Sequence, residues 1–194
     1  MSMKNTASQL MQPQISLPAR LTDAHMNVSS CFQCRKCSGG CPLTFTMDLL
    51  PHHVIRLAFL GQADRVLESR TIWVCSGCQT CTTRCPNGID IAGTMDWLKN
   101  EAVKTGCAIP EEEVAVFHRY FLEGIQAAAG RLSETHLLRR YMLYKIRRQP
   151  SLADLKQDMR LGWKLWKRGR VRLGGPPALR GKAEINEIFR KAQF

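Results

Sequence analysis

Eight of the nine cysteines in this chain of 194 residues fall into two copies of one spacing pattern, and this doubling restricts the fold more than any other feature. Each copy reads C-x2-C-x2-C-x3-C-P, and each position lies 44 residues from its counterpart. The first copy is Cys31, Cys34, Cys37 and Cys41 with Pro42, and the second is Cys75, Cys78, Cys81 and Cys85 with Pro86. A fold for this chain must therefore arrange two loops that are dense in thiols.

The spacing favours iron–sulfur clusters over zinc. Three thiolates two residues apart wrap around one face of a cubane, whereas the fourth sits one residue further on and projects away from that cluster. In two-cluster ferredoxins the fourth cysteine ligates the other cluster, so we predict two 4Fe-4S clusters with crossed ligands. The predicted sets are Cys31, Cys34 and Cys37 with Cys85, and Cys75, Cys78 and Cys81 with Cys41. Zinc is the disfavoured alternative, because its sites pair two C-x2-C halves across a longer span.

The sequence favours a chain that is made and kept in the cytoplasm. No run approaches the length of about 18 apolar residues that a membrane span needs, and the first residues are polar. Thiols stay reduced in the cytoplasm, so a disulfide framework does not explain the cysteines.

Charge and cysteines are distributed unevenly along the chain. Residues 1–130 hold 11 Lys/Arg and 11 Asp/Glu, residues 131–194 hold 17 and 5, and every cysteine lies between Cys31 and Cys107. We therefore predict a flexible arm over residues 1–20, the cluster domain over 21–130 and a basic helical region over 131–194.

The apolar spacing predicts a mainly α protein with no alternating strand pattern. Capping signals delimit the longer helices: Gly61 ends one that starts at Pro51, and Asp90 and Gly106 bracket another. Further helices are expected over 63–69, 111–129, 134–149, 151–167 and 183–192.

Other residues give weaker signals. Cys107 lies outside both motifs and reads as a free thiol, and the His52–His53 pair reads as a helix-start or packing feature. Arg35, Lys36 and Arg84 lie inside the motifs, where cations would raise the potential of a cluster, although a solvated surface charge explains them equally well. Trp73 and Trp97 are expected to pack in the core. No nucleotide-binding glycine motif or Ser/His/Asp arrangement is present, so we predict no catalytic residue.

The two motifs, separated by 33 residues of helical pattern, resemble those of the C subunit of heterodisulfide reductase. The resemblance extends over about Ser29 to Gly106, and the tail WKLWKRGRVRLGGPP is similar to the C-terminal end of that family. It implies an α-helical ferredoxin domain with a basic helical C-terminal extension. It also implies a non-catalytic electron relay between a flavin subunit, of the A type, and a disulfide-converting catalytic subunit, of the B type.

Two rival classes remain open at the level of sequence. One is the iron–sulfur subunit of a membrane-linked dehydrogenase of the glycerol-3-phosphate or glycolate type, and the other, less favoured, is a nucleic-acid-binding iron–sulfur protein. The basic region interleaves aromatic, aliphatic and cationic residues over His136–Arg148 and Trp163–Arg168. This mixture is typical of protein interfaces, so we expect a docking region for partner subunits, with peripheral membrane contact as the alternative and no nucleic-acid partner.

Overall fold

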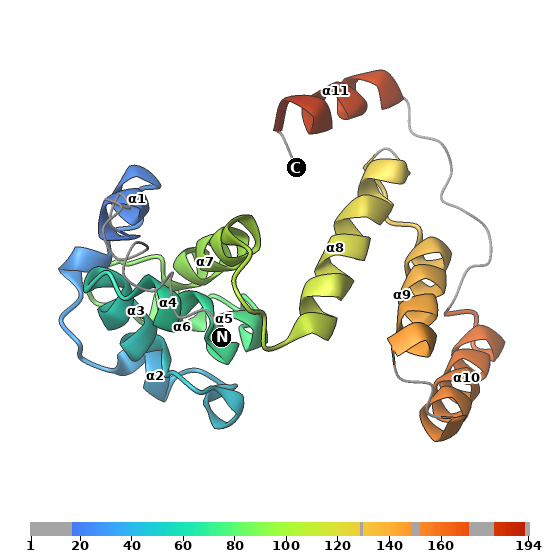
Figure 1. The fold of residues 1–194 in the computed structure, drawn as a ribbon, viewed down its shortest axis with the longest axis horizontal. Helices are drawn as coiled ribbons and strands as arrows, with labels where there is room; N and C mark the ends of the chain where they lie inside the picture. The colour runs from blue at the N-terminus through green and yellow to red at the C-terminus, as the bar shows by residue number, and fades with distance from the viewer. Residues whose placement is uncertain (1–16, 129, 149–151, 171–180, 193–194) are drawn as a thin grey trace, which may run out of the picture. The chain divides into compact units, whose positions relative to one another are not determined.

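The computed structural model describes residues 17–128, 130–148, 152–170 and 181–192, and every regular element in these ranges is helical (Figure 1). The prediction of a mainly α fold is confirmed. The elements are α1 (Leu17–Asp23), the 3₁₀ helix η2 (Val28–Ser30), α2 (Lys36–Gly39), the 3₁₀ helix η3 (Thr44–Thr46), α3 (Pro51–Phe59), α4 (Ala63–Leu67), α5 (Arg70–Val74), α6 (Thr80–Thr83), α7 (Ile91–Thr105), α8 (Glu112–Ala127), α9 (Glu134–Arg148), α10 (Leu152–Lys167) and α11 (Lys182–Ala192).

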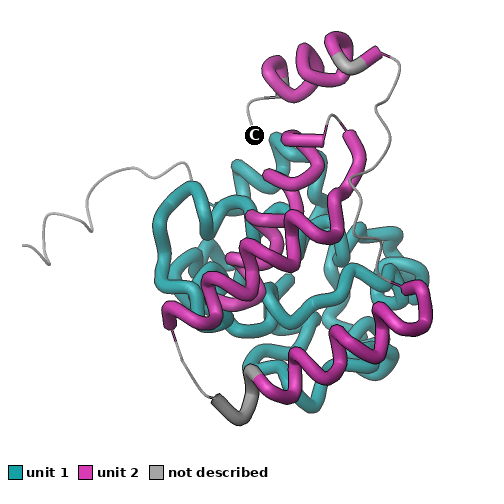
Figure 2. The backbone as a smooth tube through the Cα atoms, turned by 90° about the vertical axis from the view of Figure 1, so that its right-hand side faces the viewer, with its two compact units in different colours: residues 1–112 teal, residues 113–194 magenta. Residues whose placement is uncertain are grey.

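The chain divides into two compact units, residues 1–112 and 113–194 (Figure 2). The charge distribution predicts the corresponding boundary at residue 130, one helix later. The difference arises because α8 packs against α9: the rings of Phe117 and Tyr141 meet edge to face at 5.6 Å, and Arg140 pairs with Glu123 at 2.5 Å.

The N-terminal arm predicted over residues 1–20 falls mostly outside the described residues. Residues 17–20 are helical instead, because Leu17 and Leu21 on α1 are buried and Arg20 pairs with Glu101 of α7 at 2.5 Å. Apolar burial and an ion pair together hold this short helix on the first unit.

The core of the first unit lies among α1, α3, α4, α5 and α7. Its largest fully buried side chains include Leu21, Ile55, Ile72, Met95 and Leu98. Trp73 is buried as predicted, whereas Trp97 is half-buried beneath the guanidinium of Arg20 at 5.6 Å.

The ends of α7 follow the predicted capping. The Asp90 carboxylate accepts a hydrogen bond from the Gly93 backbone N–H at 2.9 Å, and Gly106 ends the helix with a left-handed φ of 68°. These interactions satisfy terminal backbone groups that would otherwise lack partners.

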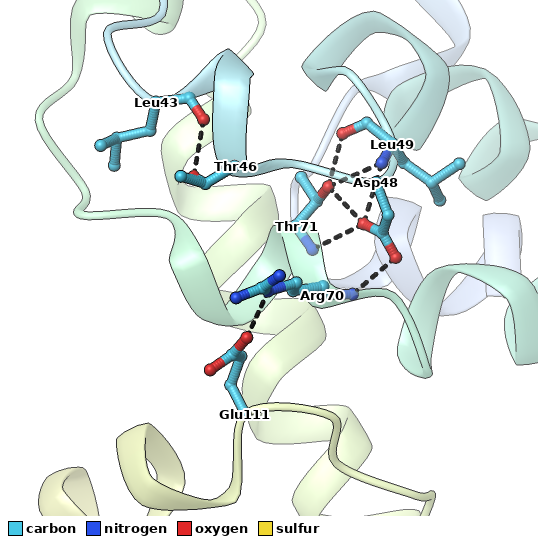
Figure 3. Close-up of polar contacts among 7 residues, drawn as sticks. All are labelled: Leu43, Thr46, Asp48, Leu49, Arg70, Thr71 and Glu111. Atoms are coloured by element: carbon cyan, nitrogen blue, oxygen red, sulfur yellow. Dashed lines mark hydrogen bonds and ion pairs between the residues drawn. The ribbon is translucent and has the colours of Figure 1, made fainter.

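A single carboxylate ties the chain after the first motif to the helix before the second (Figure 3). Asp48 accepts hydrogen bonds from the backbone N–H groups of Arg70 and Thr71, each at 2.9 Å, and from the Thr71 hydroxyl at 2.7 Å. It therefore caps α5 from a distant segment of the chain. Burial opposes ionisation of Asp48, but these hydrogen bonds outweigh it and lower the pKa of its carboxyl.

In the second unit, α9 and α10 are linked by an ion pair between Lys145 and Asp158 at 2.9 Å. Several large apolar side chains on these two helices stay exposed, among them Leu143, Trp163 and Trp166. Across the described ranges, no helix has both the length and the apolar character needed to cross a bilayer.

Candidate metal centres

The two cysteine loops repeat one backbone conformation. Gln33 and its counterpart Gly77 have φ angles of 56° and 65°, and Arg35 and its counterpart Gln79 have φ angles of 64° and 62°. Left-handed geometry is uncommon for residues other than glycine and costs about 1–3 kcal/mol, so it persists only where the surroundings enforce it. Such turns group backbone N–H groups into concavities that favour anions.

Each loop runs into a one-turn helix, α2 or α6, and these two helices contact each other. Ser38 on α2 accepts a hydrogen bond from the His52 backbone N–H at 3.2 Å, and its counterpart Thr82 on α6 accepts one from the Ala92 N–H at 3.1 Å. His52 and Ala92 are the second residues of α3 and α7. The repeat thus anchors each cysteine loop to the start of a longer helix.

The first cavity brings together the first three cysteines of the first motif and the last cysteine of the second. Cys31, Cys34, Cys37 and Cys85 line it, together with residues of α3 and α7 that include His52, Ile55 and Ile91. The four cysteines that were predicted to share one cluster therefore line one cavity.

The second cavity mirrors the first. Cys75, Cys78, Cys81 and Cys41 line it, and Pro51, Ala92 and Met95 close it from α3 and α7. Because both cavities are walled by the first turns of the same two helices, they lie side by side near two positive helix ends.

The thiols differ in exposure. Burial raises the pKa values of Cys37, Cys75 and Cys81, whereas hydrogen bonding to Thr80 lowers the pKa of the exposed Cys78 thiol. All nine cysteines are free, and Cys107 lines neither cavity; its sulfur lies 3.1 Å from the Thr105 hydroxyl.

The residues fit an anionic cluster bound by thiolates. Each cavity offers four free thiols from two loops, a largely apolar wall and two helix N-termini. In the described part of the chain, no three Cys, His, Asp or Glu side chains are arranged to hold a single metal ion.

Comparison with known proteins adds an independent finding. Residues 27–89, which contain both motifs and both cavities' cysteines, match the family model for the 4Fe-4S dicluster domain. The cysteine region is therefore similar to a 4Fe-4S dicluster domain.

The sequence resemblance to the C subunit of heterodisulfide reductase is confirmed by curated relatives. Over 80 residues the chain is 35% identical to the C subunit of the H2:CoB-CoM heterodisulfide,ferredoxin reductase of Methanothermobacter marburgensis, covering 41% of this chain and 43% of the relative. It is 35% identical over 81 residues to the iron-sulfur C subunit of the CoB–CoM heterodisulfide reductase of Methanopyrus kandleri, covering 42% of each. The C subunit of the ferredoxin:CoB-CoM heterodisulfide reductase of Methanosarcina mazei is 37% identical over 91 residues, which are 47% of this chain and 56% of the relative. The chain thus spans about half the length of the curated relatives it matches.

Residues 27–89 contain supporting residues that the cysteine spacing did not reveal. The buried His52 ring nitrogen Nδ1 lies 2.7 Å from the Ser38 hydroxyl, and burial, with the charges of His53 and Arg35, lowers its pKa. The Gln33 amide donates to the Cys31 sulfur at 3.1 Å and to the His52 carbonyl at 3.2 Å. Ser38 and Thr82 occupy the same position in the two copies of the motif. This shared position was the only sequence signal for the two hydroxyl groups that hold the loops to α3 and α7.

Proposed function

We propose that this chain is an electron-transfer iron–sulfur subunit of a heterodisulfide reductase-like complex. It relays single electrons between a flavin subunit and a disulfide-converting catalytic subunit. The curated relatives are C subunits of such reductases, and the dicluster match supports the iron–sulfur part of the proposal. No two cysteines are adjacent in the sequence, and in this proposal the disulfide chemistry takes place in the catalytic subunit.

The crossed composition of the two cavities is the observation that carries the proposal. Cys31, Cys34, Cys37 and Cys85 hold one 4Fe-4S cluster, and Cys75, Cys78, Cys81 and Cys41 hold the other. When bound, such a pair supplies one-electron redox chemistry. The chain contributes thiolate ligands, an apolar wall that limits water and the first turns of α3 and α7, which favour negative charge.

Residues 131–194 dock the partner subunits in this proposal. Exposed apolar groups on α9 and α10 lie among cationic side chains, as in protein interfaces. The exposed apolar set is Leu138, Leu143, Ile146, Met159, Leu161, Trp163, Leu165 and Trp166.

Stopped-flow mixing tests the relay. The oxidised, cluster-loaded chain is mixed anaerobically with the reduced flavin subunit of its complex, and cluster absorbance is followed. We expect rapid bleaching, and recovery when the catalytic subunit and its disulfide substrate are added. The Cys107→Ala variant is the matched control, because Cys107 lines neither cavity, and it should behave as the wild type. Absence of bleaching in a stable complex with the flavin subunit would contradict the relay.

A further inference from the structure

The two cysteine loops share a backbone conformation but differ in charge. Arg35 and Lys36 of the first loop correspond to Gln79 and Thr80 of the second, and neither loop contains an acidic residue. Arg35 and Lys36 line the first cavity beside its cysteines. The first motif therefore carries two cations, Arg35 and Lys36, and the second carries one, Arg84.

Other charged groups near the cavities do not cancel this difference. The Arg84 side chain lies against Gly40. Arg84 precedes Cys85 and Gly40 precedes Cys41, so this charge lies beside one cysteine of each cavity. Lys99 donates to the Cys75 carbonyl at 3.1 Å, but its charge is paired with Asp96 at 2.9 Å. The second cavity thus gains no net charge from this pair.

Uncharged side chains also contact cysteine sulfur atoms in both loops. The Gln33 amide donates to the Cys31 sulfur at 3.1 Å, and the Cys78 thiol donates to the Thr80 hydroxyl at 3.4 Å. Full positive charges beside the cysteines are a further difference between the loops, and their effect reaches further than that of a neutral hydrogen bond.

We propose that the site of Cys31, Cys34, Cys37 and Cys85 has the higher reduction potential and holds the electron when the chain carries only one. The proposal rests on the proposed function. Reduction adds one electron, and so one negative charge, to the bound group, and nearby cations stabilise that charge. Arg35 and Lys36 are exposed, so solvent and salt weaken but do not remove their effect.

The repeat supplies the test variants. Arg35→Gln and Lys36→Thr install the residues of the second loop, and Gln79 already shows that glutamine adopts the left-handed φ that Arg35 has. Gln79→Arg and Thr80→Lys make the reciprocal change. Arg65→Gln, at an exposed position on α4 that lines neither cavity, removes one positive charge as a control.

Anaerobic redox titration of the full chain, monitored by electron paramagnetic resonance, measures the two midpoint potentials. We expect the Arg35→Gln/Lys36→Thr variant to lower only the higher midpoint, with a smaller shift at high salt, and the reciprocal variant to raise only the lower one. Arg65→Gln should move neither midpoint.

A single midpoint in the wild type would overturn the inference, as would a lower midpoint that moves in the first variant or midpoints that move in neither variant. Iron and sulfide content is measured on every sample. Deficient content in the wild type would count against the proposed function, whereas full content with unshifted potentials would count against this inference alone.

Discussion

At the scale of single residues, the most specific prediction concerns the fourth cysteine of each motif. Cys41 lines the cavity of the second motif, and Cys85 lines the cavity of the first. The residue that follows each one is a proline, which lacks a backbone donor and turns the chain away. The position of these two side chains links the motifs to each other.

We therefore predict opposite effects from the two replacements. Cys41→Ala should damage the cluster held by Cys75, Cys78 and Cys81, and Cys85→Ala should damage the one held by Cys31, Cys34 and Cys37. Site-selective spectroscopy of the two variants, each compared with Cys107→Ala, measures which cluster is lost. Damage confined in each case to the cluster of the altered residue's own motif would refute crossed ligation.

A second prediction at the scale of single residues concerns Asp48. Its carboxylate accepts three hydrogen bonds from the start of α5, so Asp48→Asn should reduce the free energy of unfolding by about 1–3 kcal/mol. Because the folded-state pKa lies below the ordinary value, the contribution is complete above roughly pH 4 and is lost only as the pH falls through that lowered pKa.

Urea unfolding at pH 6 and at pH 8 checks the size of this contribution and its constancy above roughly pH 4. The difference between the wild type and Asp48→Asn should be the same at the two pH values. Asp23→Asn, at an exposed position on α1, should leave stability nearly unchanged. A loss at Asp48 no larger than that of the control would contradict the capping role.

At the scale of elements, sequence patterns predicted the longer helices and the short α4 but missed the other short ones. Helices α3, α7 and α9 have caps or two or more turns of apolar spacing, which local sequence encodes. Helices α2 and α6 have four residues each, too few for a periodic signal. The contacts that fix them come from residues 10 and 14 positions away, through Thr82 and Ser38.

The residues of the candidate site also fall into those that sequence patterns predict and those that they do not. The identities of the eight cysteines follow from their spacing, because loop geometry around a cluster is a local property. The roles of Ser38, His52 and Asp48 depend on side chains meeting across 14 to 23 residues, which local patterns do not encode.

Helix α10 gives an element-scale prediction about docking. Trp163 and Trp166 are 57% and 45% exposed, and their rings lie 5.1 Å apart, so they form one aromatic surface beside Lys164 and Lys167. Replacing both tryptophans by alanine should abolish copurification with the partner subunits while iron content stays unchanged, because aromatic groups dominate interface energetics.

Leu60→Ala, at a 51% exposed position in the first unit, is the control and should copurify normally. Binding to partner subunits and to vesicles with anionic lipids is measured for each variant. If the tryptophan variant loses only vesicle binding and keeps its partners, the docking role of α10 is wrong.

At the scale of the whole molecule, cysteine chemistry and positive charge belong to different parts of the chain. The dicluster match ends at residue 89, within the unit of residues 1–112, whereas the excess of Lys and Arg lies after residue 130. In the proposed function, the cysteine loops carry the electrons and the basic region docks the partner subunits. A relay protein needs both functions, because electrons pass only between docked proteins.

Metal and sulfide analysis of the anaerobically purified chain tests the central claim most directly. Two cavities with four thiols each predict about eight iron and about eight acid-labile sulfide per chain. Reduction should also give an electron paramagnetic resonance spectrum with coupling between neighbouring spins. Stoichiometric zinc without sulfide, or two magnetically independent signals, would contradict the account.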